Sequence, residues 1–173
     1  DTLYQITSEL SRTLDMDRLM PRALGMIARA VNAQDGVIMQ FEPFTDQLYT
    51  RAVINPASLH KTAPGARDYH LAETLARWLI DQADPVILID DLHSADFWDV
   101  DAPGADVWRS ALAVRLETNE ELHGVMVFLS QSPSAFVESH VGLIVAAASQ
   151  VASAFNNAEP YKMIRDQAER LGV

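Results

Sequence analysis

The residues best suited to binding chemistry gather in one irregular stretch, residues 90–109. Asp90 and Asp91 directly follow a short apolar segment. Further aspartates follow later in the stretch, and three aromatic residues lie close to these later aspartates. Carboxylates accept hydrogen bonds from polar ligands, and aromatic rings in a loop can close over an apolar or planar molecule. The stretch therefore predicts a ligand site. The alternative is that an aspartate caps a turn and that the rings only pin the loop to the protein. The site residues predicted here are Asp90, Asp91, Phe97, Trp98 and Trp108.

Further carboxylates in the same stretch raise the question of a metal site, at Asp96, Asp99, Asp101 and Asp106. Several carboxylates can bind a hard cation, but this spacing matches no calcium-loop template. The five histidines show no zinc-like spacing, and the chain has no cysteine. The absence of cysteine excludes thiol nucleophiles, cysteine-ligated zinc and thioether-linked chromophores. We expect no metal and no catalytic residue, because neither a Ser-His-Asp arrangement nor a glycine-rich phosphate loop is recognisable.

Arginines beside this stretch are the candidate partners for an anionic ligand. Arg109 ends the irregular stretch, and Arg115 lies five positions after Ser110 in a segment with strand character. Because strand side chains alternate, Ser110 and Arg115 point to opposite sheet faces unless a bulge intervenes, so only one faces a pocket. Arg115 could bind a carboxylate or phosphate, but an exposed ion pair with a neighbouring acid is the preferred interpretation.

Composition narrows the possible partners. The chain has 173 residues, 49% of them hydrophobic, and its net charge is −11. This length suits one domain over residues 1–173, and the acidic balance argues against binding nucleic acid or an anionic membrane. With no apolar run long enough to span a bilayer, we expect a soluble, cytoplasmic domain. Because the sequence begins with Asp1 rather than Met, we expect this domain to be part of a longer polypeptide.

Apolar residues at spacings of three and four predict helices at the start of the chain. Leu3, Ile6 and Leu10 belong to a first helix within residues 1–16, which Asp15-Met16-Asp17 interrupts. Asp17 would cap a second helix that ends near Val31.

Alternation and turn residues predict two β-hairpins, residues 36–54 and 110–129. A short helix near residues 71–82 and a strand at 86–89 lie between them, and residues 56–69 read as a loop. Val37, Met39 and Phe41 share one face of the first strand, although alternation does not settle which face meets the helices. Hairpins need no crossover, so the sheet should be antiparallel, with the terminal helices on one face.

The last predicted helix begins near Val137 and carries a coiled-coil rhythm at Ile144, Ala148, Val151 and Phe155. This stripe either forms a dimer seam, which is the preferred interpretation, or packs on its own sheet. At Pro160 the apolar rhythm shifts by one, so we expect a kink or break there.

Three segments together resemble the GAF domain family. They are Asp84 to Asp91, the hairpin Ser110–Leu116 with Leu122–Phe128, and the ending from Ala135-Phe136 to Ala154-Phe155-Asn156-Asn157-Ala158. The resemblance implies an α+β fold: an antiparallel sheet of about six strands, with the N- and C-terminal helices on one face and a loop-roofed pocket on the other. Val37, Met39, Phe41 and Ser110 would then line the pocket.

The resemblance also implies a sensory or regulatory function. We expect a non-catalytic, homodimeric domain of a signal-transduction protein, with Leu3, Ile6, Leu10, Ile144, Val151, Phe155 and Pro160 on the dimer or output helices. Residues 160–173 would extend toward an output domain such as a histidine kinase, nucleotide cyclase, phosphodiesterase or transcription activator. The alternative is a ligand-free dimerisation module.

Departures from the family pattern limit the ligand. Arg115 stands where proline is usual, and Pro160 stands where an apolar residue usually continues the helix. The Asn-Lys-Phe-Asp-Glu signature of cyclic-nucleotide-binding members is missing. Without cysteine, covalent bilin attachment and the thiol chemistry of methionine sulfoxide reduction are both excluded. The ligand identity stays open, and the acidic loop favours a neutral or cationic one.

Overall fold

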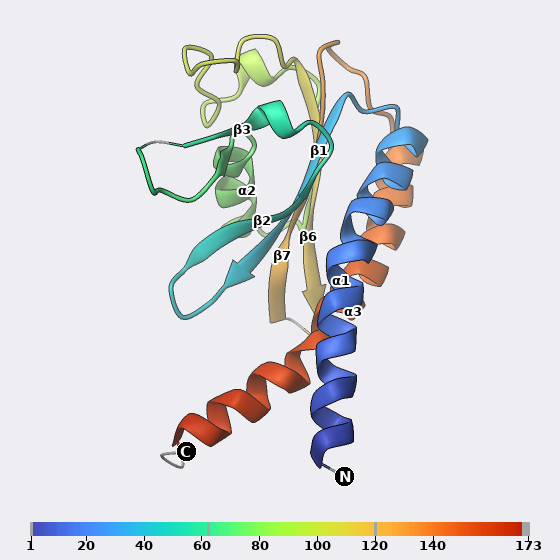
Figure 1. Cartoon of the computed structure of the whole chain (residues 1–173). Helices are drawn as coiled ribbons and strands as arrows, with labels where there is room; N and C mark the ends of the chain where they lie inside the picture. The colour runs from blue at the N-terminus through green and yellow to red at the C-terminus, as the bar shows by residue number, and fades with distance from the viewer. Residues whose placement is uncertain (1, 62, 120, 171–173) are drawn as a thin grey trace.

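Three helices and two antiparallel sheets form an α+β fold (Figure 1). The computed structural model describes the backbone of residues 2–61, 63–119 and 121–170, and the side chains of residues 3, 15–61, 63–119 and 121–157. The elements in chain order are α1 (Thr2–Ala30), β1 (Asp35–Glu42), β2 (Gln47–Val53), the 3-10 helix η1 (Pro56–Ser58), β3 (Leu59–His60), β4 (Tyr69–His70), α2 (Glu73–Ile80), β5 (Val86–Ile89), the 3-10 helix η2 (Leu92–Ser94), β6 (Ser110–Thr118), β7 (Glu121–Ser130) and α3 (Glu138–Arg170).

The main sheet has five antiparallel strands in the order β2-β1-β7-β6-β5. Both predicted hairpins are confirmed, and β1 pairs with β7 to join them at the centre of the sheet. The resemblance implied about six strands in one sheet. Residues 56–69 were expected to be a loop, but they contain η1 and supply β3, which pairs with β4 in a separate two-stranded sheet.

One face of the main sheet is covered by α1 and α3, which lie side by side and run in opposite directions (Figure 1). Alternate strand residues such as Ile38, Leu112 and Phe128 meet Leu24 of α1 and Ile144 of α3, and all five are fully buried. Removing this apolar area from water stabilises the layer by roughly 25 cal/mol per Å². The expected position of the terminal helices is confirmed.

The opposite face is covered by α2 and by the loop that follows β5 (Figure 1). Val37, Met39 and Val127 point to this side and pack with Leu75 and Leu79 of α2. Both faces of the central strands are therefore apolar and buried, which explains why the alternation in β1 could not show which face meets the long helices.

The N-terminal region forms one helix, so the interruption predicted at Asp15-Met16-Asp17 is wrong. Met16 is buried and lies on the same face of α1 as Met20 and Leu24, which follow it at a spacing of four. Asp15 and Asp17 lie on the exposed face. The two aspartates therefore interrupt the apolar pattern without interrupting the helix. Pro21 lies inside α1, where its ring nitrogen has no proton to donate to the carbonyl oxygen of Asp17.

The C-terminal helix α3 is continuous from Glu138 to Arg170, so the structure shows no break at Pro160. The ribbon does change direction toward the C-terminal end of α3 (Figure 1). The side chain of Pro160 lies outside the described residues.

None of the described helices is both long enough and apolar enough to cross a bilayer.

At Gly124 of β7 the backbone of β1 comes close. A Cβ atom at this position would lie 2.1 Å from the carbonyl oxygen of Met39 in β1. Gly124→Ala should therefore force β1 and β7 apart and lower the free energy of unfolding by roughly 2–4 kcal/mol. Denaturant unfolding followed by circular dichroism measures this change.

Gly142→Ala is the matched control, because a Cβ atom there meets nothing within 4 Å on the exposed side of α3. We expect this substitution to raise the free energy of unfolding by about 0.5–1 kcal/mol. Equal losses in both variants would contradict the close approach at Gly124.

Candidate functional site

The sheet face predicted to bind a ligand is the one covered by α2 and residues 90–109. Neighbouring side chains pack directly against the strand residues of this face. Val37 and Met39 are at most 1% exposed, and Phe41 is half-buried at the margin of the same cluster. The cover comes from Leu75 and Leu79 of α2 and from Leu92, Trp98, Ala105 and Trp108 of the loop. The structure therefore brings these predicted residues to one face, as an apolar core.

Asp91 caps a turn. Its carboxylate accepts a hydrogen bond from the backbone N–H of His93 (3.1 Å) and bonds from Arg109 (3.3 and 3.4 Å). The Arg109 guanidinium is the main reason that the pKa of Asp91 lies below its ordinary value, and the His93 amide contributes. The two predicted site residues Asp91 and Arg109 thus bond to each other, while Asp90 is exposed and its backbone oxygen accepts from Ser134. This favours the turn-capping interpretation of Asp91.

The aromatic residues hold the loop in place. Phe97 stacks on Trp78 of α2, with ring centroids 4.7 Å apart and planes 24° apart. Trp98 is buried and donates its ring N–H to the carbonyl oxygen of Ala105 (3.2 Å), and Trp108 is also buried. Phe97 is therefore stacked, Trp98 hydrogen-bonded and Trp108 buried in the same apolar cluster within the chain, as the pinning alternative requires.

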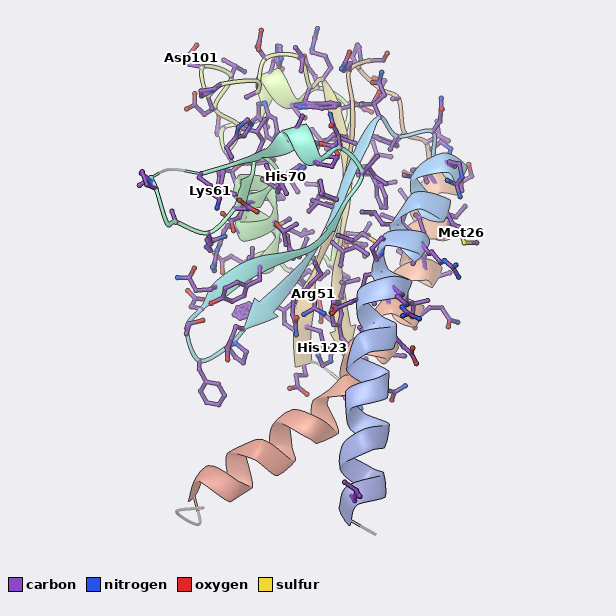
Figure 2. The ribbon with its side chains drawn as sticks, in the orientation of Figure 1. Met26, Arg51, Lys61, His70, Asp101 and His123 are labelled. Atoms are coloured by element: carbon purple, nitrogen blue, oxygen red, sulfur yellow. The ribbon has the colours of Figure 1, made fainter. Side chains whose placement is uncertain are left out.

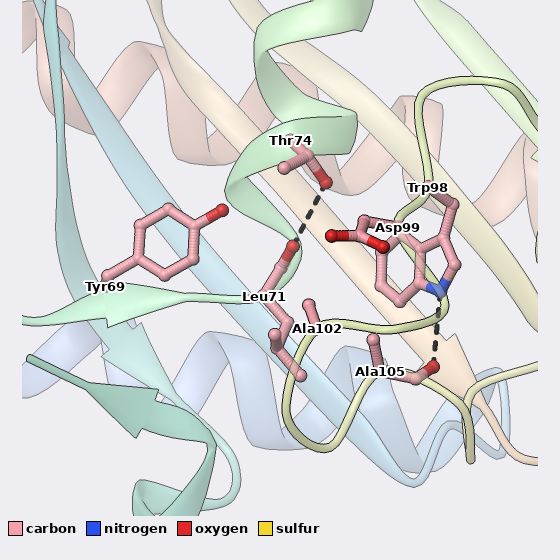
Figure 3. A pocket seen from close by; sticks show the side chains of 7 residues that line it. All are labelled: Tyr69, Leu71, Thr74, Trp98, Asp99, Ala102 and Ala105. Carbon is pink, nitrogen blue, oxygen red and sulfur yellow. Dashed lines mark hydrogen bonds between the residues drawn. The ribbon is translucent and has the colours of Figure 1, made fainter. Parts of the chain in front are cut away.

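A cavity of about 50 Å³ remains between the loop and the start of α2, among Tyr69, Leu71, Thr74, Trp98, Asp99, Ala102 and Ala105. In Figure 3 the Tyr69 hydroxyl, the Thr74 side chain and the Asp99 carboxylate converge on it. Pockets for small organic ligands measure roughly 300–1,000 Å³, so this cavity is too small for such a ligand in the present conformation.

Larger depressions lie elsewhere. One of about 440 Å³ lies on the β1–β2 hairpin and includes Phe41 and Arg51, and one of about 210 Å³ lies between α3 and the β5–β6 edge and includes Arg115. Neither lies beneath the loop of residues 90–109.

The assignment of Ser110 to the pocket face is wrong. Ser110 is fully buried on the α3 side, where its hydroxyl donates to the carbonyl oxygen of Ser132 (2.6 Å). Arg115 takes the other face, as alternation requires, because the irregularity in the β6–β7 register lies beyond it, between Leu116 and Glu117.

Arg115 is also not an exposed ion pair. Its side chain is only 13% exposed, and besides bonding Glu117 it donates to the carbonyl oxygens of Leu79 (3.1 Å) and Gln82 at the end of α2. A cation at a helix C-terminus satisfies carbonyl groups that have no partner within the helix. Arg115 therefore fixes α2 to the sheet.

A buried polar cluster that the sequence did not predict lies at the start of β1; we call it the Asp35 cluster. The Asp35 carboxylate accepts bonds from the Ser58 hydroxyl (2.6 Å), the His70 Nε2 (3.1 Å) and the Gly36 amide (2.8 Å). Asp35, Ser58 and His70 are at most 8% exposed. His70 lies inside the protein between the β3–β4 segment and the sheet (Figure 2).

This cluster is not a catalytic triad. In a triad the serine bonds the histidine, but here Ser58 and His70 both bond Asp35, and the second ring nitrogen of His70 accepts from the Ala72 amide (2.9 Å). The partners lie 23 and 35 residues from Asp35 in sequence. The one sequence feature that could have indicated this cluster is an isolated aspartate, Asp35, at the start of the apolar strand β1.

A family sequence profile described as "GAF domain" matches residues 13–156, which is most of the chain. The chain belongs to the GAF domain family. No curated protein sequence matches it significantly.

Several solved structures share the fold at low identity. The GAF domain of a phosphoenolpyruvate-protein phosphotransferase from Acinetobacter has a TM-score of 0.68 at 18% identity, over 92% of this chain and 93% of that one. A domain of a putative two-component sensor histidine kinase from Sinorhizobium meliloti 1021 has a TM-score of 0.61 at 18% identity, over 89% and 97%. A free methionine-R-sulfoxide reductase from Neisseria meningitidis, in complex with its substrate, has a TM-score of 0.68 at 13% identity, over 91% and 88%. At these identities the likeness shows the fold alone.

In this GAF domain the residues predicted for a dimer seam are mostly interior. Ile144, Val151 and Phe155 are at most 5% exposed and pack against the chain's own core, so they cannot form a seam between two copies. Leu3 is 72% exposed, whereas the side chains of Ile6 and Leu10 lie outside the described residues. The apolar side chains that α1 and α3 do expose include Leu19, Met26 and Leu143.

Among the described residues of the GAF domain, no three histidine, aspartate or glutamate side chains lie together in a way that could hold a metal ion.

Asp35→Asn tests the energetic importance of the Asp35 cluster. Burial raises the pKa of Asp35, but hydrogen bonds from His70 and Ser58 outweigh it and hold the pKa below the ordinary value of 3.8. At pH values above 3.8 the charged carboxylate of Asp35 therefore stabilises the folded state. This contribution to stability is lost as the pH falls through the pKa that Asp35 has in the folded state. Asp35→Asn should lower the free energy of unfolding by roughly 1–3 kcal/mol at pH 7. In acid its free energy of unfolding should change less with pH than that of the unsubstituted chain.

Asp46→Asn is the control, because Asp46 is 80% exposed in its ion pair with Arg77. It should change the free energy of unfolding by less than about 1 kcal/mol. Denaturant unfolding between pH 2 and 7, in steps of about one pH unit, measures both variants. An unchanged acid dependence in Asp35→Asn would contradict the assignment.

Proposed function

We propose that this GAF domain is a non-catalytic regulatory module of a signal-transduction protein and works as a homodimer. The observation that carries the proposal is the layer formed by α1 and α3. These helices begin and end the chain, pack together on one sheet face, and extend past the sheet at the same end of the molecule (Figure 1). A change in the packing of this layer would therefore reach segments attached at either end.

The chemistry of the chain supports a non-catalytic role. With no cysteine, the thiol chemistry expected of methionine sulfoxide reductases in this family is not possible. The polar atoms of Ser58 and His70 are buried and bonded within the Asp35 cluster, so no nucleophile is presented to a substrate there.

A cytoplasmic location and an output domain such as a histidine kinase or cyclase are part of this proposal. The solved histidine kinase domain with the same fold supports the signalling context.

The side chains that fill the sheet face under α2 support the alternative in which the domain holds no organic ligand in this conformation. Side chains of the loop and of α2 occupy the place where the sequence predicted a ligand, and they leave about 50 Å³. A ligand-binding sensor is the second candidate. The Tyr69 hydroxyl favours it, because it points into this cavity and has no hydrogen-bond partner among the described residues (Figure 3). Such a ligand would have to displace the loop.

Dimerisation is proposed through the exposed side of α1. Leu19 and Met26 lie seven residues apart, hence on one side of the helix, and are 47% and 65% exposed. Figure 2 shows Met26 pointing away from the body of the domain. Two apolar side chains in this arrangement give a second copy a surface to bury.

The double variant Leu19→Glu/Met26→Glu tests the dimer. It should convert a dimer to a monomer in light scattering, because burying two carboxylates in an apolar interface is unfavourable. The fold should persist, because both side chains point to solvent in the protomer.

Val107→Glu is the matched control, since Val107 is 47% exposed but lies in the loop, away from α1. It should remain dimeric. A wild-type chain that stays monomeric at about 100 μM would refute the dimer proposal.

A further inference from the structure

The imidazole of His70 joins two parts of the fold. Its Nε2 lies 3.1 Å from the Asp35 carboxylate at the start of β1, and its Nδ1 accepts the backbone N–H of Ala72 at 2.9 Å. His70 is 1% exposed and Ala72 is fully buried, so water does not replace either bond readily.

These contacts determine the protonation state of the ring. A backbone N–H is always a donor, so Nδ1 must carry a lone pair, and the ring proton must be on Nε2, where it is donated to Asp35. The folded state therefore requires a neutral His70. A proton added to Nδ1 would set two N–H groups against each other at 2.9 Å, and the bond to Ala72 could not persist, whereas the bond to the charged Asp35 carboxylate would become an ion pair.

The other charged groups around the ring bond to one another. From β1, Asp35 contacts His70, and from η1 the neutral Ser58 shares the same carboxylate oxygen. Arg67 pairs with Glu73 of α2 at 2.9 Å, and Lys61 of the β3–β4 connection pairs with Asp68 at 3.9 Å. Tyr69 precedes His70, and burial and Glu73 raise the pKa of its hydroxyl. His60 of β3 is exposed. Among the described residues, Asp35 is thus the charged group bonded to the imidazole.

The bond to Ala72 lies at the start of α2. Ala72 is the residue before the first helical position, Glu73, and no side chain caps the helix there. The amide of Ala72 is tied to the protein through His70, whereas Arg115 holds the other end of α2. Losing the His70 bond would therefore remove this polar attachment at the start of α2, while the apolar contacts of Leu75 and Leu79 and the Arg115 bonds at the other end remain.

We propose that the Asp35 cluster is a proton-operated latch, in which uptake of a proton by His70 releases the start of α2 while the main sheet stays intact. Trp78 of α2 stacks on Phe97, so the release also loosens the loop of residues 90–109. Histidine is the side chain whose charge changes between pH 5 and 8. The latch goes beyond the proposed function and does not depend on dimerisation.

Hydrogen exchange of the whole 173-residue chain tests the latch. Nuclear magnetic resonance would follow the His70 ring nitrogens, the Ala72 amide and the protection factors of α2 between about pH 5 and 8. Protection of the α2 amides should fall roughly ten-fold with the same midpoint as protonation of the His70 ring. Protection in β6 and β7 should stay constant.

Two variants sharpen the test. In His70→Gln the amide side chain keeps a neutral donor and a neutral acceptor, so the protection of α2 should no longer depend on pH. His123→Gln is the matched control, because His123 is another buried histidine, on β7, and its loss should leave the pH dependence unchanged.

Three results would overturn the latch. The first is a His70 ring that titrates without any change in the Ala72 amide or in α2. The second is a ring that stays neutral until the whole chain unfolds. The third is an α2 response that persists in a folded His70→Gln variant. If that variant fails to fold, the wild-type titration decides alone.

Discussion

The fold depends on one constraint, which is that the central strands are apolar on both faces. In β1, β6 and β7 successive side chains point to opposite sides, and both sets are buried. A sheet with two apolar faces is stable in water only when each face is covered. The long helices α1 and α3 cover one face, and α2 with the loop of residues 90–109 covers the other. Each candidate functional feature belongs to one of these two covers.

The two covers differ in how they are attached. The α1–α3 layer is held by apolar packing along most of its described length, with Met20, Leu24, Ile144 and Phe155 in one core. The α2 layer also has an apolar core, but it is fixed by specific polar bonds as well: Arg115 at one end of α2, His70 at the other, and Asp91–Arg109 at the loop. The hydrogen bonds of ionisable side chains change when those side chains gain or lose a proton, whereas apolar packing does not, and the proposed latch acts through this difference.

The sequence predicted the elements well and their orientation less well. Hairpins and the final helix carry strong local patterns, and the structure confirms them. The prediction at Asp15-Met16-Asp17 is wrong because two exposed aspartates resemble a helix stop, although Met16 between them belongs to the buried apolar stripe of α1. Alternation placed Ser110 and Arg115 on opposite faces, yet only their partners determine which face is which: Ser132, in the connection before α3, for Ser110, and the end of α2 for Arg115.

The candidate site was the least predictable part. Asp91, Phe97 and Trp98 do lie in the cover of the α2 face, but they bond to Arg109, Trp78 and Ala105, and such pairings depend on tertiary packing. The same holds for the Asp35 cluster, whose members come from three separate segments. In Ile144, Val151 and Phe155 the four-three rhythm is real, but the stripe faces the domain's own core, and periodicity alone does not distinguish that core from a second copy.

The central claim is that the α2 face is filled by the chain's own side chains. Native mass spectrometry of the purified domain tests it most directly, because co-purified small molecules add to the mass of the intact protein. The account predicts masses that equal one or two polypeptide chains, 19.1 kDa each, with nothing further bound. A stoichiometric additional mass that is released on denaturation would contradict the account and would show that the loop of residues 90–109 opens to hold a ligand.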